Sequence, residues 1–410
     1  MANGEGKLNL TFTDQLSYLN GVHRSGWPFV MNQLKTLHND NGVWCDTYVD
    51  RTFHWAKPHH LPYTRPWVGF SHHTFDTTHS DYNNVNLLKD SSFLQSLPHC
   101  KGLFVFSKAL QERWVHEFAL RGLQVPVVAL THPTETVGYE SRFSMDAFRL
   151  NRQKKLISIG AWLRDSFAIY KLNEGKGPII AGELQYAKTA LQGPRMQGYF
   201  KPTNFFRAFT QPSWRNFDSK PPVPGVTVAD VGSVSLPRQR VLSVNGELPA
   251  GVIEASTSNI GSGEDTMCRD IMCRDSTYAL NKYVSGALGH LKALDQSVTI
   301  LPTATDEVYD TLLKDNVIFL NLIDAGAVNT ILECVVRNTP ILVNRLPSIE
   351  EILGEDYPLF YDALPKDGSL LTFSMIEAAH QYLDRLDKSK LTADHFLSAV
   401  ISSEIYNSLT

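Results

Sequence analysis

Residues 322–344, LIDAGAVNTILECVVRNTPILVN, join a predicted helix start to a carboxylate that could do chemistry there. Thr330 and Glu333 have the T-x-x-E spacing of a capping box, in which both side chains bind free N–H groups of the first helical turn. The same geometry suits a ligand, because a helix N-terminus attracts a diphosphate and a nearby carboxylate can accept both hydroxyls of a ribose. On this segment alone, both interpretations stay open.

The approach to this helix consists of small and polar residues. The stretch DAGAVNT begins at Asp324 and includes Ala327, Val328 and Asn329 before Thr330. Side chains this small would let phosphates come close to the helix N-terminus. Asn338 and Pro340 then favour a helix end, and the following ILVN is typical of a buried strand.

A pair of cations follows another predicted strand. Arg164 closes the segment KKLISIGAWLR, and Lys171 lies seven residues further on. At the carboxyl end of a strand, the two could neutralise a leaving diphosphate, Arg as a planar fork and Lys as a point charge. The competing interpretation is that both are solvated surface cations, as most Lys and Arg residues are.

Histidines end a third predicted strand, in the segment WVGFSHHTFDTTH. His72 there could act as a general base or orient an acceptor hydroxyl. A metal site made of His72, His73, Asp76 and His79 is an alternative, but their spacing matches no zinc pattern. Gly26 follows the first predicted strand and could let backbone approach a ligand, although no G-x-G-x-x-G is present.

Composition excludes several classes of protein. The 410 residues are 43% hydrophobic and 20% charged, which is typical of a globular chain of about two domains. A net charge of -4 disfavours non-specific nucleic-acid binding. Five scattered cysteines, including Cys268 and Cys273 in a C-x4-C repeat, favour a reducing cytoplasm over a disulfide framework. We expect neither a signal peptide nor a membrane span, so any membrane contact would be peripheral.

Strands and helices alternate along most of the chain, which predicts open parallel sheets. Before residue 145 the expected elements are strands 7–13, 66–73, 101–107 and 125–134 and helices 26–38 and 108–123; residues 134–153 read as a linker. After it they are strands 154–164, 297–302, 316–322, 341–344 and 357–362 and helices 278–296, 307–315, 329–337 and 373–388. Residues 192–276 lack apolar periodicity and predict an irregular insertion.

Together these residues resemble the GT-B glycosyltransferases, in particular the family-4-like enzymes of bacterial and large-virus glycan assembly. The resemblance is carried by SIGAWLRDSFAIYK, by the block from EVYDTLLKD to DYPLFY, and less strongly by RPWVGFSHHT and CKGLFVFSKAL. It implies an α/β fold of two Rossmann-like domains facing a cleft. The expected domains are residues 1–145 for the acceptor, 146–375 for the nucleotide sugar, and a helical segment 376–410 that packs back on the first.

The resemblance also implies roles for single residues. Glu333 matches the second glutamate of the family's E-x7-E pattern, which binds the nucleotide ribose, and the first glutamate is replaced by Ala325. Arg164 and Lys171 match the basic pair that faces the donor diphosphate, at a longer spacing than usual. His72 matches a histidine at the cleft floor.

The implied activity is metal-independent, retaining transfer of a hexosyl or pentosyl group. The donor would be UDP- or GDP-linked and the acceptor a glycan or lipid-linked sugar. Two alternatives remain: a non-catalytic GT-B partner subunit, which the missing first glutamate favours, and a nucleotide-sugar epimerase.

Overall fold

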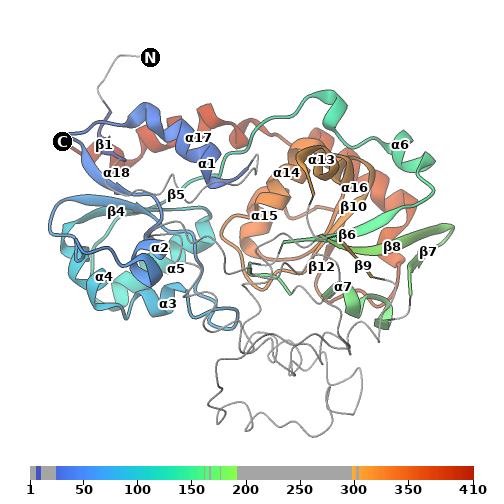
Figure 1. The fold of residues 1–410 in the computed structure, drawn as a ribbon, viewed down its shortest axis with the longest axis horizontal. Helices are drawn as coiled ribbons and strands as arrows, with labels where there is room; N and C mark the ends of the chain where they lie inside the picture. Colours follow the sequence, from blue (N-terminus) through green and yellow to red (C-terminus); the bar gives the residue numbers. More distant parts are fainter. Residues whose placement is uncertain are drawn as a thin grey trace, which may run out of the picture.

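The computed structural model describes residues 6–10, 25–160, 162–165, 168–175, 177–191, 298–301 and 304–410. These residues form two α/β units, each built on its own sheet (Figure 1). The expected insertion at 192–276, the expected helix at 278–296 and the two cysteines of the C-x4-C repeat lie outside the described residues.

The first unit is built on a five-stranded sheet of order β1-β2-β3-β4-β5. Every neighbouring pair is parallel. Its strands are β1 Leu8–Asn9, β2 Val43–Asp46, β3 Trp67–Phe70, β4 Cys100–Val105 and β5 Val127–Ala129. Two apolar clusters cover the two faces: Val68 and Phe104 belong to one, and Trp67 and Leu103 to the other. Because both faces are covered, β3 is an unbroken buried run.

The second unit is built on a sheet of order β12-β11-β10-β6-β8-β7, with β9 also paired to β8. Only β7 runs antiparallel to its neighbour among these described strands. The strands are β6 Lys155–Ile159, β7 Ile179–Ala181, β8 Leu184–Leu191, β9 Thr299–Leu301, β10 Val317–Leu320, β11 Ile341–Asn344 and β12 Phe360–Tyr361. β6 and β10 are adjacent, so the loops after them open at the same edge of the sheet.

Helices pack against both sheets. In the first unit and the connection that follows they are α1 Trp27–Leu34, α2 Val49–Arg51, α3 Asn84–Leu87, α4 Ser91–Ser96, α5 Lys108–Leu120 and α6 Met145–Leu150. The remaining α-helices are α7 Ala168–Lys171, α13 Asp306–Asp315, α14 Asn329–Arg337, α15 Pro347–Leu353, α16 Phe373–Arg385, α17 Ala393–Ser402 and α18 Glu404–Ser408. Short 3-10 turns are η2 Lys35–Leu37, η4 Leu97–His99, η5 Tyr139–Ser141, η6 Leu172–Gly175, η10 Ser369–Leu371 and η11 Ser389–Leu391, and η3 Thr52–Ala56 is a π-helix.

The end of the chain divides between the two units. Helix α16 buries Ile376 and Leu383 in the core of the second unit. Helices α17 and α18, red in Figure 1, lie against the first unit, where Phe396 and Ile405 join the same apolar cluster as Trp27 of α1. The chain therefore crosses back to the first unit after α16.

Most expected elements are present, and the α/β class with parallel sheets is confirmed. The linker prediction for 134–153 was wrong in part, because it contains η5 and α6. Ser144 caps α6 by accepting from the Ala147 N–H, and Phe148 is buried in the core of the second unit. Strand β2 was not predicted, since its residues Val43–Asp46 are too few to show a period.

The two units contact each other through polar groups. The Glu351 carboxylate of α15 accepts from the backbone N–H groups of Lys108 and Ala109, at 2.7 and 2.9 Å, and so caps the N-terminus of α5 in the first unit. His79 of the first unit accepts from the Leu163 N–H of the second at its Nε2, at 3.0 Å. These contacts link α15 to α5, and the loop after β6 to the loop that carries His79.

Candidate nucleotide-sugar site

The loop after β6 turns back sharply and places Arg164 at the edge of the second sheet. Gly160 has φ +79, and a methyl group there would collide with the guanidinium of Arg164. Arg164 donates to the Ile159 carbonyl and, at 3.2 Å, to Thr330 Oγ1 in the first turn of α14. The sequence-predicted Arg164 and Thr330 are therefore in direct contact.

Glu333 lies in the same cluster and is 1% exposed. Its carboxylate accepts hydrogen bonds from two hydroxyls, Ser25 at 2.5 Å and Tyr309 at 2.6 Å. The capping-box interpretation was wrong: α14 begins at Asn329 after the N-cap Val328, and no side chain among the described residues caps it. Glu333 lies more than a turn inside the helix, so it turns toward hydroxyls instead of N–H groups.

Charge within this cluster is balanced. Burial lowers the pKa of Arg164 to about 10, while Tyr309 and Glu333 oppose that change. The guanidinium therefore stays protonated at neutral pH. Burial, and then Glu333, raise the pKa of Tyr309, which keeps its phenol neutral and able to donate. Arg164 Nε is buried without a hydrogen-bond partner among the described residues.

The first unit reaches this cluster through the residues that precede α1. Ser25 donates to Glu333 and, at 3.4 Å, to the Asn329 carbonyl. Gly26 is the N-cap of α1 and extended, at φ -75 and ψ 165. Trp27 follows, and its ring meets the imidazole of His72 edge-on at 4.3 Å. Residues 25–27 of the first unit therefore connect Glu333 of the second unit to His72, through the contacts of Ser25 and Trp27.

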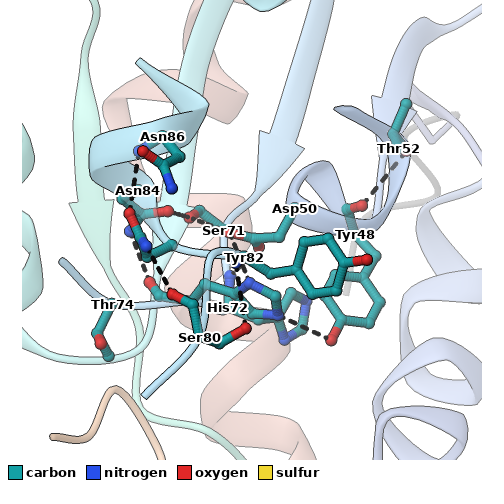
Figure 2. Close-up of polar contacts among 12 residues, drawn as sticks. Tyr48, Asp50, Thr52, Ser71, His72, Thr74, Ser80, Tyr82, Asn84 and Asn86 are labelled. Atoms are coloured by element: carbon teal, nitrogen blue, oxygen red, sulfur yellow. Dashed lines mark hydrogen bonds and ion pairs between the residues drawn. The ribbon is translucent and has the colours of Figure 1, made fainter. Parts of the chain in front are cut away.

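His72 is held from two sides. Its backbone N–H donates to Asp50 at 2.6 Å (Figure 2), and its Nε2 is 3.0 Å from the Thr47 carbonyl. A carbonyl only accepts, so Nε2 carries the proton and Nδ1 carries the lone pair. Burial lowers the pKa of His72 to about 4 although Asp50 opposes this, so the ring is neutral at pH 7. Neutral Nδ1 can accept a hydrogen bond from a hydroxyl.

Asp50 organises the loop that carries this histidine. The carboxylate also accepts from Ser71 Oγ at 3.3 Å, and its Oδ1 lies 3.9 Å from His73 Nδ1. Asn84 joins the network by donating to the His73 carbonyl at 2.6 Å. Figure 2 shows Asp50, Ser71, His72 and Asn84 close to one another. The backbone from Ser71 to His73 is therefore fixed by buried polar contacts.

Lys171 and Asp324 both interact with residues nearby in the sequence. Lys171 in α7 pairs with Asp165 at 2.6 Å, and both side chains are largely buried. Burial lowers the pKa of Lys171, and Asp165 opposes the shift. A diphosphate would meet a lysine whose charge already faces a carboxylate. Asp324 accepts from the Ala325 N–H at 2.8 Å, and Ala325 itself is buried in the core of the second unit.

The residues between Asp324 and α14 touch the first unit. A methyl group at Gly326 would lie 3.6 Å from the His72 carbonyl, in ordinary contact. Ala327 packs against the first unit's apolar cluster that contains Trp27, whereas Val328 is buried in the second unit. The small residues that precede α14 therefore also lie close to the His72 segment of the first unit.

The metal interpretation of the histidine segment finds no support in the described residues, where no group of three or more His, Cys, Asp or Glu side chains is placed to hold a metal. Asp76 instead accepts from the Thr78 and His79 N–H groups, at 2.9 and 2.7 Å. Cys45, Cys100 and Cys334 are free thiols. No helix in the described part of the chain is long and apolar enough to cross a bilayer.

Sequence reasoning missed Ser25, Tyr309 and Asp50. Ser25 adjoins the predicted Gly26, which was a usable signal. Tyr309 reaches Glu333 from α13 and looks like one more aromatic residue in a helix. Asp50 reads as a surface residue beside a short strand, yet it is fully buried.

Comparisons with known proteins give structural matches only. No known protein family and no curated protein matches the sequence. Among solved structures, the chain is similar to the α,α-trehalose 6-phosphate synthase of Burkholderia multivorans, with 10% identity, TM-score 0.46, and 95% of this chain and 77% of that one covered. It is also similar to the sucrose-phosphate synthase of Thermosynechococcus elongatus, with 8% identity, TM-score 0.45 and 93% and 76% covered.

A third match is the Anabaena protein HepE in complex with UDP-glucose, with 10% identity, TM-score 0.39 and 84% and 70% covered.

Proposed function

We propose that the protein is a glycosyltransferase that moves a sugar from a UDP- or GDP-linked donor to a glycan or lipid-linked acceptor, without a metal. The observation that carries the proposal is the meeting of Arg164, Thr330 and Glu333 at the start of α14, opposite Ser25 of the other unit. This arrangement offers an anion site next to a diol site, which are the two recognition elements of a nucleotide diphosphate.

The anion site consists of Arg164 and the first turn of α14. No side chain caps this helix among the described residues, so its first N–H groups and the positive end of its dipole can meet a phosphate. The buried Nε of Arg164 adds a donor that needs an acceptor. When the bond between the sugar C1 and the diphosphate breaks, this positive charge would stabilise the leaving group.

The diol site is Glu333. Its two oxygens already accept from one hydroxyl each, which is the pattern that the two hydroxyls of a ribose would present. Ribose binding would therefore replace the Ser25 or Tyr309 hydroxyl with a hydroxyl of the ligand. The exchange preserves the number of hydrogen bonds that the buried Glu333 carboxylate accepts, so the carboxylate stays fully paired.

The acceptor side is His72. Its Nδ1 lone pair can orient an acceptor hydroxyl, and its low pKa makes it a weak base at neutral pH. The hydroxyl oxygen would form the new bond to C1, and its proton would leave with the diphosphate or to water. We place Lys171 near the diphosphate and Asp324 near the donor sugar, and we propose retention of configuration on the family resemblance alone.

Release of nucleoside diphosphate tests this function. Purified protein is incubated with UDP-glucose, UDP-N-acetylglucosamine or GDP-mannose, and free UDP or GDP is measured, with and without a chelator. We expect slow, chelator-insensitive release from one donor and at least a tenfold slower release by Arg164→Ala, with Arg113→Ala in an exposed ion pair of α5 as the control.

A non-catalytic binding subunit is the second candidate, because a buried alanine stands where the resemblance expects a donor-sugar carboxylate. It predicts that nucleoside diphosphates raise the Tm while no donor is cleaved. Scrambled sugar stereochemistry without acceptor would instead indicate an epimerase. Absence of any response to UDP, GDP and their sugars would contradict all three.

A further inference from the structure

Five aromatic rings gather beside His72, at the junction of the two units. The ring of Tyr48 lies 4.4 Å from that of His72 and 5.9 Å from those of both Trp55 and His73. Trp55 is 5.8 Å from His73 and 5.1 Å from Tyr82. Trp162 closes the group from the second unit, at 4.8 Å from His73.

The rings come from four separate places in the chain. Tyr48 follows β2, His73 follows β3, Tyr82 precedes α3, and Trp162 lies in the turn after β6 that also carries Arg164. His73 at the centre is buried, whereas Tyr48, Trp55, Tyr82 and Trp162 each keep part of their surface exposed. This group, called the aromatic cluster below, therefore keeps part of its surface accessible near the carboxyl ends of β3 and β6, which belong to different sheets.

The segment that carries Trp55 has an unusual backbone. Residues Thr52–Ala56 form a π-helix, and Lys57 after them has φ +39. A π-helix turn is rare and occurs often at functional sites, and a left-handed lysine is costly enough to need a reason. In this π-helix His54 and Trp55 lie next to Tyr82, at ring distances of 5.6 and 5.1 Å. The unusual backbone therefore carries a ring of the aromatic cluster.

Polar groups border the aromatic faces. The Tyr48 hydroxyl lies 3.4 Å from His73 Nε2, and the His72 ring lies 4.4 Å from the Tyr48 ring. Aromatic faces with hydroxyl and imidazole groups at their edges match the chemistry of a sugar. A pyranose ring presents C–H groups on one face, which pack against an aromatic ring, and hydroxyls around its rim, which form hydrogen bonds.

We propose that the aromatic cluster binds a pyranose ring of the acceptor, with Trp55 as the stacking platform. The Tyr48 ring, at 82° to that of Trp55, would form one wall, and Trp162 would form the wall contributed by the second unit. The inference rests on the proposed transferase function and names the acceptor class for that same site. Because Tyr48 also contacts His72, at a ring distance of 4.4 Å, a hydroxyl at the Tyr48 edge of the stacked sugar would lie close to the His72 imidazole. An acceptor without a sugar ring, such as a simple alcohol or a protein side chain, would not use this surface.

Saturation-transfer NMR tests the proposal directly. Full-length protein is mixed with methyl β-D-glucopyranoside, methyl β-D-galactopyranoside or methyl α-D-mannopyranoside, in the presence of UDP. We expect transfer to the ring C–H protons of at least one glycoside, reduced at least fivefold in Trp55→Ala. Trp162→Leu, a change in the other unit, should reduce it as well. Trp44→Ala is the matched control, because Trp44 is a partly exposed tryptophan of β2 that packs near Tyr63 instead.

The increase in Tm caused by UDP is measured on the same samples. This second measurement distinguishes failure of the acceptor inference from failure of the transferase proposal. If UDP raises the Tm of every variant but no glycoside receives saturation from the wild-type protein, the acceptor inference is overturned and the donor site stands. Equal transfer to wild type, Trp55→Ala and Trp162→Leu would also overturn it. If glycosides bind as expected while UDP and GDP have no effect, the aromatic cluster is a sugar site and the transferase proposal fails.

Discussion

At the scale of single residues, the central feature is a buried carboxylate that accepts from two hydroxyls supplied by different units. Ser25 is 308 residues from Glu333 in the sequence, and Tyr309 is 24 residues away. No local pattern could predict either partner. The position of Glu333 on α14 followed from apolar periodicity, but its partners depend on how the two units meet.

Tyr309→Phe isolates one of these hydrogen bonds. The variant keeps the ring and removes the hydroxyl, so Glu333 stays buried with one donor fewer. We expect the free energy of unfolding to fall by about 1–3 kcal/mol, as for a lost hydrogen bond to a charged group. Urea denaturation measures the change. Tyr139→Phe, on a side chain that is 85% exposed, should have almost no effect. Equal stability of the two variants would show that the Tyr309 hydroxyl does not stabilise Glu333.

At the scale of secondary-structure elements, the buried strands were predicted better than the short helices and the helix caps. Buried parallel strands such as β3 and β10 are unbroken apolar runs, because helices cover both faces of their sheets. Helix α6 was missed because only Met145 and Phe148 are buried in it, which is too few residues to show a helical period. The cap on α5 was also beyond prediction, since Glu351 comes from the other unit.

Glu351→Ala tests that cap. Two N–H groups of α5 would lose a carboxylate partner, and one link between the units would be lost with them. We expect a stability loss of about 0.5–2 kcal/mol, the range for helix N-caps. The neighbouring Glu350→Ala removes only a surface ion pair with Arg345 and should cost less, about 0–1 kcal/mol.

Small-angle scattering of the same variants would report any separation of the units. If Glu351→Ala and Glu350→Ala are indistinguishable in stability and in radius of gyration, the contact between α15 and α5 does not hold the units together.

At the scale of the whole molecule, the first unit depends on neutral histidines. Burial lowers the pKa of His72, His79 and His132 to about 4 and that of His73 to about 3. The ordinary value is about 6.5, so between pH 6.5 and 4 the unfolded chain binds protons that the folded chain does not. The free energy of unfolding therefore falls as the pH falls through this window.

We expect the Tm to drop steadily from pH 7 to pH 5. His79→Gln should make the dependence shallower by about one proton, which is on the order of 1 kcal/mol per pH unit. The exposed His116→Gln is the control and should leave the slope unchanged. A Tm that is constant across this range would contradict the burial of these histidines as neutral groups.

The proposed donor site depends on Glu333 binding the ribose of a nucleoside diphosphate. Calorimetric titration of UDP and GDP measures this binding. We expect one of them to bind the wild-type protein and the control Glu377→Ala, a partly exposed carboxylate paired with Arg149, equally well. Glu333→Ala should bind it at least tenfold more weakly, because about 1.4 kcal/mol is lost for each factor of ten and two charge-assisted bonds are removed. Equal affinity of Glu333→Ala and wild type, with the variant shown to be folded by circular dichroism, would show that Glu333 does not bind the ribose.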